Sequence, residues 1–140
     1  MNCISDTGFI VARWSKHQAR RDWAVRCWEQ AALPMLTSAA NLQEAGWLLK
    51  NHAIILRMVC DGDLLPILDF EKEAVRLHEL ASDYSPRMDV ADAAIVRLSE
   101  LYPHHTVLTV DREDFSIYRR HRTEVLPCDF GPALNVRRET

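Results

Sequence analysis

The segment Asn2-Cys3-Ile4-Ser5-Asp6-Thr7-Gly8 is the strongest indication of the fold, because a short apolar run ends there on an acid and a turn. Thr106-Val107-Leu108-Thr109-Val110 is a β-branched run that ends in the same way, on Asp111. Between the two, short apolar runs alternate with helical patterns, which is typical of βαβ units and a mostly parallel sheet. Ligands of such sheets bind beyond the carboxyl ends of the central strands, so we expect Asp6 and Asp111 to face one site.

The remaining elements follow from apolar periodicity and from turn and capping residues. Strands are expected over residues 2–5, 33–36, 64–68, 106–110 and 124–126. Helices are expected over residues 9–16, 22–31, 38–50, 52–60, 70–81, 89–101 and 111–121. Pro66 lies in the third strand and Pro127 follows the last, so these strands suit sheet edges, whereas the first and fourth suit the centre.

Length and composition predict one globular domain of an intracellular protein. The 140 residues carry 17 basic and 20 acidic side chains, a net charge of −3 that by itself indicates no membrane or nucleic-acid partner. The cysteines Cys3, Cys27, Cys60 and Cys128 form no CxxC pair, which argues against a zinc site or a redox dithiol. Without a secretion signal or an apolar run of membrane-spanning length, the chain is expected to be cytoplasmic.

Four carboxylates stand out by their positions. Asp6 and Asp111 directly follow strands, Asp92 lies in the first turn of the helix that Asp89 begins, and Glu44 lies within a helix. Asp6, Asp92 and Asp111 each have a purely structural alternative, because acids end strands, cap helices and interact favourably with helix N-termini. For these three, the sequence leaves the structural and the functional explanations open.

Glu44 is harder to explain structurally. Its neighbours at helical spacing are Ala40, Asn41, Trp47 and Leu48, a largely apolar face. A carboxylate on a buried apolar face is costly unless a partner compensates its charge, and no basic residue lies at helical spacing. A metal ion is one suitable partner. Four converging acids would repel one another unless divalent cations neutralised them, and oxygen ligands suit Mg²⁺ or Mn²⁺. Such ions on carboxylates carry out phosphodiester hydrolysis.

Four segments of the chain resemble, in order, the motifs of PIN-domain nucleases. Ile4-Ser5-Asp6-Thr7-Gly8 resembles the first motif, and Thr37-Ser38 followed by Glu44 resembles the second. Met88-Asp89-Val90-Ala91-Asp92-Ala93 resembles the third, and Thr109-Val110-Asp111-Arg112 with Phe115 resembles the fourth. The match runs from about residue 2 to residue 126. Each motif is weak alone, but four in order at suitable separations are quite specific.

The resemblance implies a three-layer α/β/α sandwich with a five-stranded, mostly parallel sheet, formed by a nuclease domain over residues 1–130 with a tail at 131–140. It implies that four acids bind Mg²⁺ or Mn²⁺ and are catalytic: Asp6, Glu44, Asp92 and Asp111. Supporting roles are expected for Thr7, Thr109, Asp89 and Asp114. At this length the chain is similar to VapC-type toxins of bacterial toxin–antitoxin pairs, which implies a homodimeric endoribonuclease silenced by a small antitoxin.

Basic residues gather in two segments, at 13–26 and 112–122, and each segment follows a strand that carries a candidate acid. Fourteen of the seventeen basic residues are arginine, which suits bidentate contact with phosphate. We expect RNA contacts from Arg13, Arg112, Arg119 and Arg120. An ordinary solvated helix face is the alternative for both segments.

Two other functions stay open. A phospho-acceptor signalling domain also gathers acids at strand ends, but it needs a lysine after the last strand, and the only lysines are Lys16, Lys50 and Lys72. A non-catalytic PIN-like module that binds RNA or protein is the second alternative, although all four acids are present.

Overall fold

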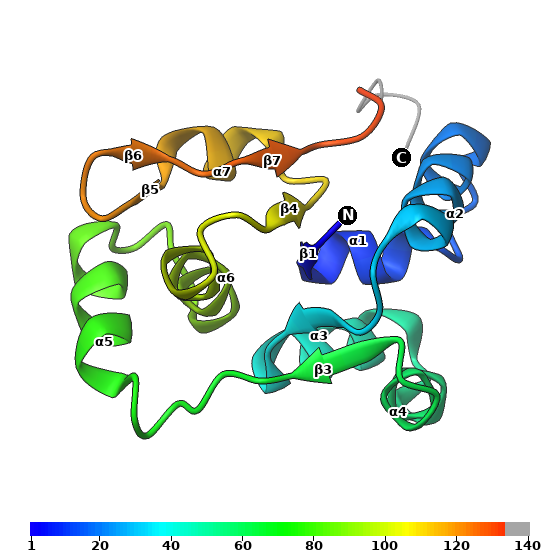
Figure 1. The fold of residues 1–140 in the computed structure, drawn as a ribbon, viewed down its shortest axis with the longest axis horizontal. Helices are drawn as coiled ribbons and strands as arrows, with labels where there is room; N and C mark the ends of the chain where they lie inside the picture. Colours follow the sequence, from blue (N-terminus) through cyan, green and yellow to red (C-terminus); the bar gives the residue numbers. More distant parts are fainter. Residues whose placement is uncertain (134–140) are drawn as a thin grey trace.

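The computed structural model describes residues 1–133, which form an α/β fold with helices on both faces of one sheet (Figure 1). The strands are β1 Cys3–Ser5, β2 Met35–Thr37, β3 Leu64–Pro66, β4 Thr106–Leu108, β5 Arg119–Arg120, β6 Glu124–Val125 and β7 Cys128–Asp129. The helices are α1 Thr7–Ala12, α2 Gln18–Gln30, α3 Ala39–Leu49, α4 His52–Cys60, α5 Ala74–Asp83, α6 Val90–Leu101 and α7 Arg112–Ile117.

The main sheet has five parallel strands in the order β3-β2-β1-β4-β7. β1 and β4 are central, as predicted, and Ser5 pairs in register with Leu108, so that Asp6 and Thr109 leave the sheet at the same edge. β3, which contains Pro66, is an edge strand, and the other edge strand, β7, starts directly after Pro127. Both prolines therefore lie where a missing backbone N–H is tolerated.

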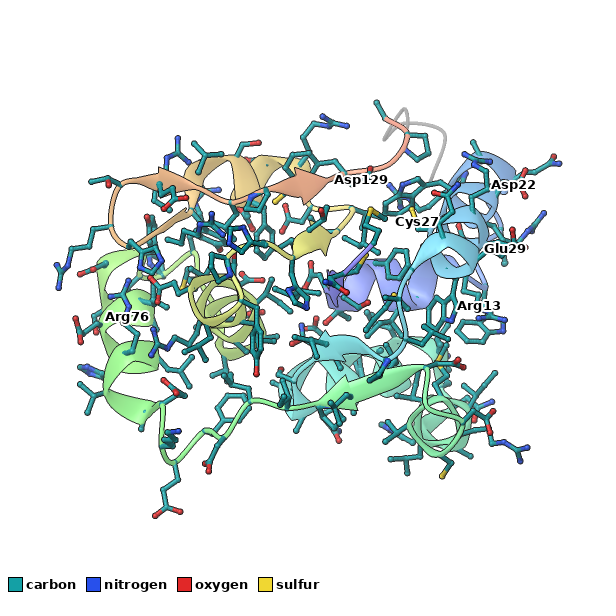
Figure 2. The ribbon with its side chains drawn as sticks, in the orientation of Figure 1. Arg13, Asp22, Cys27, Glu29, Arg76 and Asp129 are labelled. Atoms are coloured by element: carbon teal, nitrogen blue, oxygen red, sulfur yellow. The ribbon has the colours of Figure 1, made fainter. Side chains whose placement is uncertain are left out.

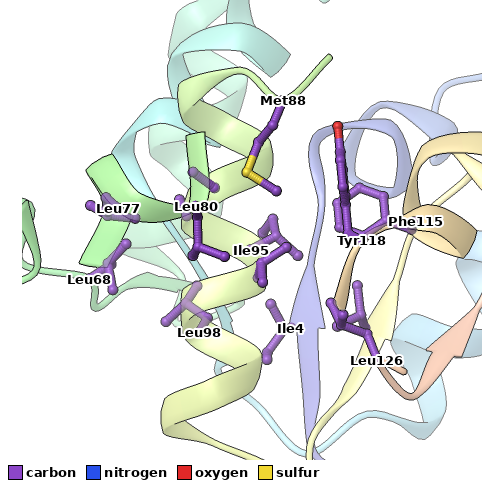
Figure 3. Packing of buried hydrophobic residues seen from close by; sticks show 14 of the residues in the cluster. Ile4, Leu68, Leu77, Leu80, Met88, Ile95, Leu98, Phe115, Tyr118 and Leu126 are labelled. Carbon is purple, nitrogen blue, oxygen red and sulfur yellow. The ribbon is translucent and has the colours of Figure 1, made fainter. Parts of the chain in front are cut away.

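Side chains alternate between the two faces of the sheet, as the pleat requires. Ile4 and Val107 face a core that α5, α6 and α7 cover, and Figure 3 shows its packing around Ile95 and Leu98 of α6. Neighbouring Cys3 and other strand residues face a second core, lined by α1, α2, α3 and α4. The layers are thus helices, sheet and helices, which is the predicted sandwich.

The sequence prediction is wrong at the last sheet strand. Residues 124–126 were expected to complete the main sheet, but β6 pairs antiparallel with β5 in a small hairpin, and Cys128–Asp129 takes the edge position. The hairpin also shortens the helix expected over 111–121, which ends at Ile117. An ion pair of 2.6 Å between Arg120 and Glu124, which are register partners, links the two hairpin strands and favours their pairing with each other.

Three further observations complete the fold. The helix expected over 70–81 begins at Ala74, after a turn at residues 70–73. Gly131 lies against Trp23 and accepts a hydrogen bond from Arg112, while most of the expected tail, residues 134–140, lies outside the described residues. None of the helices formed by residues 1–133 has the length and apolar character needed to cross a membrane.

Candidate active site

Asp6 is the most enclosed of the four candidate acids. It follows the central strand β1, begins α1, and is 6% exposed. Two side chains from other elements hold its carboxylate: the Thr109 hydroxyl donates to Oδ2 at 2.6 Å, and the Asn41 amide donates to Oδ1 at 3.2 Å. Both donors are neutral, so they orient the carboxylate without cancelling its charge.

Asn41 links the first and second motifs. Its amide also donates to the Thr7 hydroxyl at 3.1 Å, and its carbonyl oxygen accepts from the Ser38 hydroxyl. The supporting role expected of Thr7 thus consists of a buried contact with Asn41. The Asn41 side chain is therefore directed to Asp6 and Thr7.

Asp92 has both a capping role and a second partner. Asp89 and Asp92 form the capping box of α6, since the Asp92 N–H donates to Asp89 Oδ1 at 2.8 Å. The structural explanation of Asp89 is therefore confirmed. In addition, the Tyr118 hydroxyl donates to Asp92 Oδ2 at 2.8 Å, which the capping role does not require.

Asp111 caps α7 by accepting from the Asp114 N–H at 3.0 Å, and its own N–H donates to the Thr109 hydroxyl at 3.1 Å. Thr109 therefore connects Asp111 with Asp6. Asp114 forms an ion pair of 2.6 Å with Arg87, so an arginine compensates its charge. Of the two extra acids expected near the site, neither Asp89 nor Asp114 is required there by its contacts.

The acids influence one another electrostatically. Burial raises the pKa of Asp6 to about 6, and the nearby charges of Asp111 and Glu44 add to the rise. Burial also raises the pKa of Asp92 to about 7, assisted by the charges of Asp89 and Asp6. The pKa of Asp111 is raised mainly by burial. Asp6 thus lies within electrostatic range of the other three acids, as the sequence predicted.

The sequence argument for Glu44 fails, although its position supports the site. Its helical neighbours Trp47 and Leu48 are 69% and 50% exposed, so the apolar face that they form is not buried. Glu44 itself is half-buried, beside the covered face that carries Asn41. Apolar spacing identified residues that share a face, but it could not show which face of α3 packs on the molecule.

The four acids suit a divalent cation in chemistry and charge. Their donors are all oxygens, as Mg²⁺ and Mn²⁺ prefer, and within residues 1–133 no lysine or arginine forms an ion pair with any of them. However, no three His, Cys, Asp or Glu side chains of the described residues stand close enough together to hold an ion. The acids supply a suitable donor set but not a preformed cage.

The candidate RNA contacts differ in their availability. Arg112 is exposed and lies over the Phe130 ring at 4.9 Å, and half-buried Arg13 lies over the Trp28 ring at 4.8 Å, near α2 in Figure 2. Arg119 donates to the backbone carbonyls at the end of α7. Arg120 is 7% exposed, so its side chain is buried in the protein and not available for the RNA contact expected of it.

Sequence reasoning missed Tyr118 and assigned no site role to Asn41. Tyr118 and Asp92 are 26 residues apart, and a tyrosine near the end of a helix carries no pattern that indicates a carboxylate partner. Asn41 did carry a signal, because a polar side chain among apolar ones at helical spacing needs buried partners.

No family model matches the chain, and a search of curated proteins finds no significant match.

Proposed function

We propose that this chain is a Mg²⁺- or Mn²⁺-dependent endoribonuclease that hydrolyses RNA phosphodiester bonds at Asp6, Glu44, Asp92 and Asp111. In this proposal it is a PIN-type, VapC-like toxin that acts in the cytoplasm as a homodimer and is silenced by a small antitoxin. The toxin role, the dimer and the antitoxin rest on the resemblance of the four motifs.

One observation carries the proposal: near the end of the central strand β1, Asp6 lies within electrostatic range of the other three acids, and no lysine or arginine of residues 1–133 forms an ion pair with any of the four. Asp6 and Asp92 have pKa values raised to about 6 and about 7, with burial as the main cause and neighbouring acids contributing. Like-charged groups in such an arrangement destabilise the native state, so their proximity favours a role in binding a cation.

The side chains divide the work of the proposed reaction. A divalent cation bound by the acids would lower the pKa of a water molecule and stabilise the leaving oxygen. Thr109 and Asn41 fix the orientation of the Asp6 carboxylate, and Thr109 also fixes the start of the segment that carries Asp111. Exposed Arg112 is the candidate for holding the RNA backbone in place.

The second candidate is a non-catalytic PIN-like module that binds RNA or protein. The absence of a preformed ion cage among residues 1–133 favours this alternative. It predicts RNA binding that is indifferent to divalent cations. The phospho-acceptor alternative gains no support, because Lys16, Lys50 and Lys72 all precede β4 and none follows the last strand.

The decisive experiment incubates the purified protein with mixed RNA in Mn²⁺, in Mg²⁺ and in EDTA. We expect cleavage with either ion, none in EDTA, and products with 5′-phosphate and 3′-hydroxyl ends. Asp6→Asn and Asp92→Asn should lower the rate by at least about 10³-fold, a barrier change of about 4 kcal/mol. Glu71→Gln is the matched control, because Glu71 is an exposed acid in the turn before α5.

The outcomes separate the candidates. Cleavage that persists in EDTA, or that survives both Asp6→Asn and Asp92→Asn, contradicts the metal-dependent mechanism and indicates a contaminating nuclease. RNA binding without cleavage under any cation favours the non-catalytic module.

A further inference from the structure

The Tyr118 hydroxyl is a polar group inside an aromatic cluster. Tyr118 is 0% exposed, and its ring packs edge-on against Phe115, with ring centroids 5.2 Å apart (Figure 3). It also packs edge-on against Tyr84, with ring centroids 5.1 Å apart. A phenylalanine would fill the same space without a polar atom. Because a buried hydroxyl is costly unless it is bonded, packing alone does not explain a tyrosine at this position.

The partner of that hydroxyl is a candidate catalytic acid. The Tyr118 hydroxyl donates to Asp92 Oδ2 at 2.8 Å, and the Asp89 N–H approaches the same oxygen at a longer 3.5 Å. Among the described residues, no hydrogen-bond donor reaches the other oxygen, Oδ1. The bond therefore restrains rotation of the carboxylate and leaves one oxygen available.

The bond orients Asp92 without neutralising it. A phenol is a neutral donor, whereas an arginine at this place would cancel the charge that a cation must meet. The Tyr118 ring is itself restrained on both sides by Tyr84 and Phe115. Partners of metal-ligating carboxylates act in this way in metal sites generally, by fixing the ligand before the ion arrives.

We propose that Tyr118 is a positioning residue that holds the Asp92 carboxylate with Oδ1 turned toward an incoming divalent cation. This inference rests on the proposed function, since it assigns Asp92 to the ion. It extends the candidate site beyond the four acids to a residue in the segment after α7, which the sequence motifs do not include.

The test compares Tyr118→Phe with Tyr84→Phe. Each variant removes one hydroxyl from the same aromatic cluster, but the Tyr84 hydroxyl accepts from the Arg119 N–H at 2.9 Å and makes no bond to Asp92. We expect Tyr118→Phe to weaken Mn²⁺ binding, measured by calorimetry without RNA, by about tenfold, the lower end for such partners. Tyr84→Phe should bind within about twofold of wild type, as expected for a residue outside the site.

Asp92→Asn provides a double-mutant cycle. In that background, Tyr118→Phe should have no further effect on Mn²⁺ affinity, because the carboxylate that it positions is gone. A second measurement needs no variant: on Mg²⁺ saturation, the ¹³Cζ resonance of Tyr118 should shift more than that of Tyr84. This measurement decides the matter if Tyr118→Phe does not fold.

The outcomes distinguish this inference from the proposed function. If wild type binds Mn²⁺ but Tyr118→Phe binds it as tightly, or if the Tyr118 resonance does not move on saturation, the positioning role is overturned while the proposed function stands. If wild type binds neither ion, both are overturned.

Discussion

Asp92 in the first turn of α6 has its pKa raised to about 7, whereas Glu100 in the last turn of the same helix has its pKa lowered to about 2. The helix dipole alone favours the opposite result, because it stabilises negative charge at the N-terminus and destabilises it at the C-terminus. The side chains around each carboxylate therefore outweigh its position in the helix.

Glu100 accepts hydrogen bonds from two charged arginines and from one neutral backbone N–H. Burial by itself would raise its pKa, but Arg76, the His121 N–H and Arg97 outweigh this effect. Arg76 donates at 3.0 and 2.8 Å to the two oxygens, and Arg97 donates at 3.1 Å. This cluster, the Glu100 network, joins α5, on which Figure 2 labels Arg76, to α6 and the β5–β6 hairpin. Its charges are balanced within the protein, so its role is structural.

The four candidate acids are called the acid edge below. Among residues 1–133, the hydrogen-bond donors to Asp6 and Asp92 are all neutral and include Tyr118, Thr109 and Asn41. Here the protein orients carboxylates but leaves their charge uncompensated. The Glu100 network therefore stabilises the native state, whereas the acid edge destabilises it. Substitutions that remove a carboxylate should lower stability at the first cluster and raise it at the second.

The largest stability effect is expected for Glu100→Gln. It leaves Arg76 and Arg97, which are 17% and 22% exposed, without their shared counter-charge. Breaking a largely buried ion pair costs about 3 kcal/mol, the lower end for such sites. Urea unfolding should show this loss, with exposed Glu71→Gln unchanged as the control. A loss of unfolding free energy below about 0.5 kcal/mol is typical of an ordinary surface substitution. It would mean that Glu100 contributes no more to stability than an exposed residue does.

Arg120→Ala should lower the free energy of unfolding by about 2 kcal/mol, as measured by urea unfolding. The reason is that the buried guanidinium donates to Ser99, to the Pro103 carbonyl and to Glu124. Arg112→Ala, at an exposed site, should change stability little but weaken RNA binding with a reduced salt slope. Equal stability of the two variants would contradict this assignment of Arg120 to the interior.

Measuring the free energy of unfolding against pH, in EDTA, should report the effects of both clusters in one experiment. Asp6 and Asp92 bind protons more tightly in the folded state than at their unfolded values near 3.8, so stability should rise as pH falls from about 7.5 to about 5. The gain should be at least about 1.4 kcal/mol, the value of a single pKa unit, because both pKa values are raised by more than that.

Glu100 acts with the opposite sign. Its folded pKa of about 2 lies below its ordinary value of 4.5, so its stabilisation is lost as pH falls below about 4.5. In Glu100→Gln, the decrease in stability below about pH 4.5 should be absent. In Asp92→Asn, the increase in stability as pH falls through the neutral range should be smaller than in wild type. A wild-type stability that falls steadily from pH 7.5 to 5 in EDTA is the opposite of the expected profile.

Apolar patterning was sufficient to predict four of the five strands of the main sheet and the convergence of Asp6 with Asp111, because an apolar run that ends on an acid marks a strand end and parallel strands end together. The edge position of β3 followed from Pro66, since proline lacks a backbone donor. The strand expected before Pro127 lies in the hairpin instead, and the edge strand β7 follows this proline. These inferences depend on local properties of the chain.

The errors concern properties that depend on tertiary contacts. Periodicity grouped Glu44 with Trp47 and Leu48 but could not show that this face is exposed. Arg120 was read as a surface residue because its partners, Ser99 and Glu124, are recognisable only when the hairpin packs on α6. The bond between Tyr118 and Asp92 likewise depends on the folded arrangement.

The smallest stability effect is expected for Asp92→Asn in EDTA. The asparagine carbonyl oxygen can still accept from the Tyr118 hydroxyl, and a repelling charge is removed. We expect equal stability or a gain of about 1 kcal/mol, the scale of one pKa unit. A loss of similar size would mean that the interaction of the carboxylate with the start of α6 dominates.

The most direct test of the acid edge as a cation site measures the unfolding free energies of wild type and Asp92→Asn, each in EDTA and in Mn²⁺. At ten times the dissociation constant, Mn²⁺ should stabilise wild type by about 1.4 kcal/mol and the variant by clearly less, because only binding to the native state adds stability. In EDTA, the variant should equal or exceed wild type. A variant that is less stable in EDTA, and that gains as much from Mn²⁺ as wild type does, would contradict the account.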